Sequence, residues 1–157
     1  EVSIITINWL HVFIFMGIAI VFWIGLMLSR KGNRSEIILA LAVGVLFGIG
    51  GVLTKLMTAY IELQGQKLES FAFALNPVFP LMVVANVLGL FLLQMAFQSG
   101  RAAVIIPVQL AVVNGMSVLA GMLLFSESIS AYRIVCILII ICGTVILQWA
   151  SSKSSFL

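Results

Sequence analysis

The chain has 157 residues, of which 63% are hydrophobic and 8% are charged, and its net charge is +3. Because soluble domains carry about 25% charged residues, this composition excludes a soluble globular domain. The positive charge is small and dispersed, which gives no indication of nucleic-acid binding. The sequence therefore predicts a polytopic membrane protein.

Five apolar segments are long enough to cross a hydrocarbon core of about 30 Å as helices. The predicted fold class is all-α, a bundle of five transmembrane helices in one transmembrane domain that covers residues 1–157. The expected spans are about 7–28, 37–60, 77–97, 102–125 and 132–149. Since the chain begins with Glu1 and not with methionine, we also expect a processed product or a part of a longer protein.

The second span contains three glycines and one charge. Gly44, Gly48 and Gly51 recur at steps of four and three residues, a spacing typical of a seam where two membrane helices pack closely. Lys55 lies about a turn and a half from the far end of the same span. A lysine inside a span is either functional or extends its ammonium group to the interface, and the sequence leaves both interpretations open.

The third span carries Asn86 and Gln94, which are eight residues apart and share a face of the predicted helix. Bonding between helices is the simpler interpretation of both side chains. If their face points toward the fourth span, the two helices instead frame one polar space.

The fourth span has one face of small and polar residues. The members of this face recur at steps of 4, 7, 3 and 4 residues; they are Ala103, Pro107, Asn114, Ser117 and Gly121. Such a face needs protein or water beside it, so Asn114 and Ser117 are candidate substrate-binding residues, with Gln109 beside the main stripe. The alternative is that these side chains only bond to a neighbouring helix.

The distribution of lysine and arginine predicts the orientation in the membrane. Five of these residues follow the first span, the third span or the last span: Arg30, Lys31, Arg34, Arg101 and Lys153. The opposite side has Lys67 and Arg133, and also Lys55 if it reaches out. We therefore expect the N-terminus outside and the C-terminus in the cytoplasm.

The run GRAAVIIPVQLAVVNGMSVLAGMLLFSESISAYRIVCILIIICGTVIL resembles the last two helices of a repeat in the drug/metabolite transporter (DMT) superfamily, EamA-like branch. The similar features are the turn at Gly100, the early Pro107, the closing Glu127, a short link, and Gly143 in the next helix. Upstream, GGVLTKLMTAY and FLLQMAFQSGRAAVIIPV resemble the C-terminal half of NIPA-type magnesium transporters. The likeness covers roughly residues 37–147.

Family members have ten helices in two inverted repeats of five, so the resemblance implies that this chain is the C-terminal repeat. It implies a transporter half in the cell (inner or plasma) membrane that moves a small polar metabolite or ion by alternating access with a second half or a second copy. Magnesium is a poor fit, because Lys55 opposes a bare cation and the chain contains no aspartate.

Two functions remain open at this stage. One is the transporter half, with Asn114, Ser117, Gln109, Asn86, Gln94 and Lys55 as substrate-binding residues. The other is a membrane scaffold subunit that docks on a larger complex and transports nothing. The sequence shows no nucleophile with a base, no cluster of metal ligands and no phosphate loop, so we expect no enzyme activity, no metal and no cofactor.

Overall fold

The computed structural model describes residues 9–29, 35–63 and 76–124, together with the isolated positions 132, 135, 136, 138, 139, 142, 143 and 146. The described part is helical throughout its regular elements: α1 (Trp9–Leu28), α2 (Ser35–Leu63), α3 (Val78–Ser99) and α4 (Ala102–Leu124). All four helices are long and apolar enough to cross a membrane. A membrane-embedded helical protein and four of its five predicted spans are therefore confirmed, whereas most of the fifth span, 132–149, lies outside the described residues.

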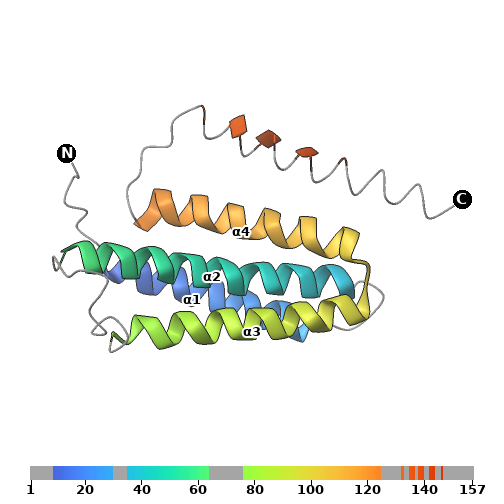
Figure 1. Ribbon diagram of the computed structural model, residues 1–157, viewed down its shortest axis with the longest axis horizontal. Coiled ribbons are helices and arrows are strands. Elements are labelled where there is room, and N and C mark those ends of the chain that lie inside the picture. The colour runs from blue at the N-terminus through green and yellow to red at the C-terminus, as the bar shows by residue number, and fades with distance from the viewer. Residues whose placement is uncertain are drawn as a thin grey trace, which may run out of the picture.

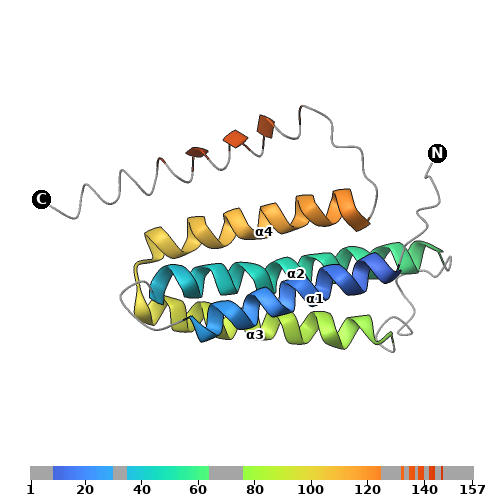
Figure 2. The same cartoon turned by 180° about the vertical axis from the view of Figure 1, so that it is seen from behind.

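The four helices run antiparallel to their chain neighbours, with α2 at the centre (Figure 1). In that view α3 and α4 lie on either side of α2, and α1 lies behind it; Figure 2 shows α1 from the other side. In the membrane-spanning stretch of α2, 67% of the residues are buried, against 11%, 17% and 6% in α1, α3 and α4. The other helices thus cover α2 and leave their own outer faces open.

The back of α2 packs on α1 through branched side chains. Ile49, Leu53 and Leu56 of α2 belong to one buried cluster with Val12 and Ala19 of α1. The outer surface of α1 remains exposed and is strongly apolar, with Phe13 71% and Val21 70% exposed. A surface of this kind is stable against lipid chains, which offer no penalty for apolar contact.

Glycines let the other helices approach α2 closely. A Cβ at Gly44 would overlap Val112, and one at Gly48 would overlap Met116, so both glycines lie directly against α4. Gly51 has open space around its Cα. The predicted close-packing seam is therefore confirmed at Gly44 and Gly48 and was wrong at Gly51, where α2 is exposed.

The ends of the helices are held by local hydrogen bonds. Asn76 precedes α3, and its Oδ1 accepts a hydrogen bond from Val78 N over 3.0 Å. At the start of α4, the Arg101 carbonyl accepts from Val104 N (2.9 Å) and Ile105 N (3.1 Å). Such bonds satisfy the first donors of each helix, which have no partner within the helix itself.

One contact joins the beginning of α2 to the turn between α3 and α4. Arg101 N donates to Glu36 Oε2 over 3.2 Å, across 65 residues of sequence. The intervening Gly100 is fully extended (φ −163°, ψ −176°), and a Cβ there would overlap the Glu36 side chain. A carboxylate just ahead of a helix is also favoured by the helix dipole, so Glu36 stabilises the start of α4.

Replacing Glu36 with alanine is expected to lower the free energy of unfolding by about 0.5–1 kcal/mol, because an exposed hydrogen bond to Arg101 N is lost. The measurement is thermal unfolding in detergent followed by tryptophan fluorescence. Ser99→Ala is the matched control, since the Ser99 hydroxyl donates only within its own helix, to Met95 O (2.9 Å). Equal losses in the two variants would contradict a role for the Glu36 contact.

Candidate functional site

The central helix α2 has one exposed face. Between residues 39 and 58 only four of its residues are exposed, and they recur at i, i+3, i+4 and i+7: Gly51, Thr54, Lys55 and Thr58. This spacing places all four on one side of a helix. We call these four residues the open face of α2.

The open face lies on the side of the bundle opposite α1. Leu53 and Leu56 turn toward α1, and the open face occupies the remaining side of α2 between α3 and α4. The viewer of Figure 1 looks at this side, because α1 is behind α2 there. The molecule therefore has an apolar back, formed by α1, and a front on which its most buried helix presents polar groups.

The helix α3 adds Asn86 to the front. Its amide lies directly on Gly50 of α2, where a Cβ would overlap it, and Nδ2 donates to Met82 O over 2.8 Å. Met82 also reaches α2, since its Sδ is 3.1 Å from Thr54 Oγ1. Gln94, eight residues beyond Asn86, is exposed. The predicted hydrogen bonding of Asn86 to another helix is therefore not found among the described residues: its hydrogen bond stays within α3, and the amide packs on Gly50 of α2.

The helix α4 places Ser117 beside its contact with α2. Met116 lies against Gly48, and Ser117 follows it by about 100° round the helix axis. Because α4 runs from right to left in Figure 1, this right-handed step turns Ser117 toward the viewer, onto the front. Ser117 is exposed, and its Oγ donates to Val113 O over 2.9 Å.

Asn114 and Gln109 take different positions on α4. The backbone carbonyl oxygen of Gln109 lies against Gly44, so this residue is at the edge of the contact between α4 and α2. Asn114 is two residues before Met116, about 200° round the axis, and so it faces away from α2. Both side chains are half-buried, and neither makes a hydrogen bond with another residue of the described part.

The structure thus brings some predicted site residues together and separates others. Lys55, Asn86 and Ser117 come from three helices and share the front of the bundle, whereas Asn114 lies on the outer side of α4. The sequence analysis missed Thr54 and Thr58. The signal that could have found them is their spacing from Gly51 and Lys55, which makes an unusual polar face in an otherwise apolar helix.

The charge on this side of the molecule is positive. Across the four described spans (9–28, 36–59, 78–99 and 102–124), Lys55 is the only lysine or arginine. Within the described ranges no three histidine, cysteine, aspartate or glutamate side chains lie close enough to hold a metal ion. The front therefore offers one ammonium group, hydroxyls and amides, which suits the binding of a polar organic molecule through hydrogen bonds.

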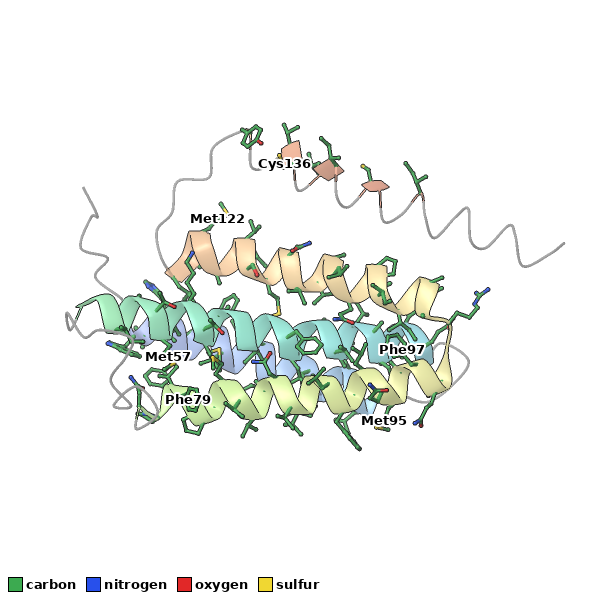
Figure 3. The ribbon with its side chains drawn as sticks, in the orientation of Figure 1. Met57, Phe79, Met95, Phe97, Met122 and Cys136 are labelled. Atoms are coloured by element: carbon green, nitrogen blue, oxygen red, sulfur yellow. The ribbon has the colours of Figure 1, made fainter. Side chains whose placement is uncertain are left out.

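Figure 3 labels several methionine and phenylalanine side chains of the bundle. The labelled Met57 and Phe79 lie where α2 and α3 approach each other near the end of α2, and Met122 lies near the end of α4. Methionine adapts its shape readily to a changing neighbour. Met57, in the contact between α2 and α3, is buried.

The comparisons with known proteins assign no family: no family model matches the chain, and no curated protein or solved structure is significantly similar to it.

Proposed function

We propose that the chain is one five-helix half of a DMT/EamA-like transporter, which moves a small polar metabolite or ion across the cell membrane by alternating access with a second half or a second copy. In this proposal the front of the bundle faces the other half. The N-terminus lies outside and the C-terminus lies in the cytoplasm, as the loop charges favour.

One observation carries this proposal: polar side chains of three helices, exposed or half-buried, lie on one side of the bundle, whereas the opposite side, formed by α1, is apolar. Polar groups are costly against lipid chains, because hydrocarbon offers them no hydrogen-bond partner. The hydroxyls of Thr54 and Ser117 already donate within their helices, so it is above all the charge of Lys55 that favours protein or water in front of this side. Transporters built from repeats supply both, since the substrate site lies between the repeats near the middle of the bilayer.

The test is uptake into liposomes reconstituted with the purified chain. A panel of labelled organic acids, amino acids, sugars and metal ions identifies the flux, and Lys55→Met and Ser117→Ala, both on the front of the bundle, are then compared with the natural sequence. Each variant is expected to lower the flux about tenfold, the equivalent of losing one hydrogen bond to a polar or charged group. Gly25→Ala on α1, which has open space around it, serves as the control and keeps full activity.

The alternative, a scaffold subunit, predicts a different result when the same membrane preparation is analysed. Native gels and mass spectrometry of the membrane extract would show a stoichiometric complex with unrelated large subunits, and no solute would enter the liposomes. A dimer or a pairing with a second five-helix half, together with flux, supports the transporter. Flux that both substitutions leave unchanged would remove the site assignment.

A further inference from the structure

The open face of α2 presents oxygen lone pairs to its surroundings. Thr54 Oγ1 donates to Gly50 O over 2.9 Å, with Met82 Sδ as a second acceptor at 3.1 Å. Thr58 Oγ1 donates to Thr54 O over 3.0 Å. A hydroxyl has one proton and two lone pairs. Since both protons are directed at acceptors of the protein, each hydroxyl meets a ligand as an acceptor.

Asn86 of α3 likewise uses its donor within its own helix and leaves an oxygen as an acceptor. Its Nδ2 donates to Met82 O over 2.8 Å, and among the described residues its Oδ1 accepts no hydrogen bond. The amide lies on Gly50, which directly precedes Gly51 of the open face and is one helical turn from Thr54, and its carbonyl oxygen is a further acceptor. The three side chains thus place three acceptor oxygens on the front of the bundle.

Lys55 adds hydrogen-bond donors to the open face of α2, which otherwise presents acceptors. It is exposed, and it lies between the two threonines in the sequence and on the same side of α2. Its ammonium group carries three donors and a full positive charge. An ammonium group next to three acceptors is complementary to a ligand that combines an anionic group with a neighbouring donor.

We propose that the open face of α2, together with Asn86, binds an oxyanion that carries a neighbouring hydroxyl or ammonium group. Lys55 holds the carboxylate or phosphate, and the oxygens of Thr54, Thr58 and Asn86 accept hydrogen bonds from the donor. This inference rests on the proposed function and specifies its substrate class. The same chemistry occurs in small hydroxy or amino acids and in lipid headgroups, and the experiment separates these two sources.

The experiment measures thermal unfolding of the full chain in phosphatidylcholine nanodiscs at constant ionic strength. Four soluble probes differ in one feature each: lactate (anion with hydroxyl), alanine (anion with ammonium), propionate (anion alone) and alaninamide (ammonium alone). Ligands that bind the folded state raise the unfolding temperature. We expect lactate or alanine to raise it at concentrations about tenfold lower than propionate does, and alaninamide to have no effect, because each matched hydrogen bond contributes about a factor of ten.

Substitutions assign the effect to residues. Lys55→Met is expected to abolish the shift and Lys55→Arg to retain it, while Thr54→Val with Thr58→Val removes the difference between lactate and propionate. Arg101→Gln is the control for a cation at a helix end. Size-exclusion profiles show whether each variant is folded. If Lys55→Met does not fold, the comparison of Lys55→Arg with the natural sequence still tests the role of the positive charge.

A second arm replaces part of the lipid with phosphatidylglycerol, whose headgroup combines a phosphate with hydroxyls. If this lipid competes with lactate, or stabilises the chain only when Lys55 is present, the headgroup is a ligand of the same site. Equal responses to lactate and propionate, a response to alaninamide, or a shift that survives in Lys55→Met would overturn the proposal. Binding without liposome flux would refute the transporter alone, and flux of a solute that Lys55→Met does not affect would refute this site alone.

Discussion

Replacing Gly48 with leucine is expected to lower the free energy of unfolding by about 2–3 kcal/mol, the range found when extra carbon atoms are forced into a packed interior. The Cβ alone would come within 2.6 Å of Met116 Sδ, and the rest of the leucine side chain would push α4 away from α2. The measurement is the thermal or denaturant unfolding of the detergent-solubilised chain, with size-exclusion chromatography to detect an expanded state.

Gly51→Leu is the matched control, because it makes the same substitution three residues along the same helix, where a Cβ meets open space. Leucine is the better helix former by about 0.8–1 kcal/mol, so this control is expected to be neutral or slightly more stable. Met116→Ala is expected to restore part of the stability lost in Gly48→Leu, because it makes room for the new side chain. If both leucine variants are equally unstable, the packing of α4 on Gly48 does not explain the loss of stability.

Replacing Gly51 with tryptophan is expected to reduce transport more than any other single change on the front of the bundle, by roughly a hundredfold. An indole ring buries about 200 Å² of surface, and here it would project from the first residue of the open face, about one helical turn before Thr54 and Lys55. Because a Cβ at Gly51 would meet open space, the fold is expected to remain intact while the approach of a substrate or of the second half is blocked. The measurement is liposome uptake of whichever solute the natural chain carries.

Gly25→Trp on α1 is the control for this substitution. Gly25 also has open space around it, but it lies on the apolar back of the bundle, where an indole ring meets lipid. Equal loss of flux in the two tryptophan variants would show that the ring disturbs insertion into the membrane in general. Full activity of Gly51→Trp would mean that the front of the bundle is not the transport surface.

Hydropathy predicted most of the described helical structure, because a long uncharged segment has few alternatives to a spanning helix. The limits of α2 differ most: the helix begins at Ser35 and ends at Leu63, whereas 37–60 was predicted. The extra turn carries Glu62, which a hydropathy profile places outside the apolar core. The profile measures the solubility of a segment in lipid, while a helix continues for as long as its backbone hydrogen bonds do.

The arrangement of the helices could be predicted only in part. The spacing of Gly44 and Gly48 indicated a close contact, but it could not identify α4 as the partner. Gly51 continued the same spacing and lies elsewhere, because the three-residue step from Gly48 turns the helix by about 300° and carries the residue past the edge of the contact. Which neighbour covers each side of α2 depends on long-range packing, and no local pattern encodes it.

The candidate site shows the same limit. Asn86 and Ser117 attracted attention as polar residues in apolar helices, and both lie on the front with Lys55. Thr54 and Thr58 did not, because threonine is common in membrane helices and satisfies its own hydroxyl by bonding to the preceding turn, as both do here. Their significance comes from exposure on a helix that is otherwise covered, and exposure is a property of the assembled bundle.

The hydrogen bond between Glu36 and Arg101 can form only late in the synthesis of the chain. The two residues are separated by 65 positions, and ribosomes add about 5–20 residues per second, so the carboxylate of Glu36 waits roughly 3–13 s for its backbone donor to be made. During that interval the nascent hairpin of α2 and α3 lacks this hydrogen bond. The translocon or a membrane chaperone therefore has a window of several seconds in which it meets α2 and α3 before the contact at this end of the bundle can form.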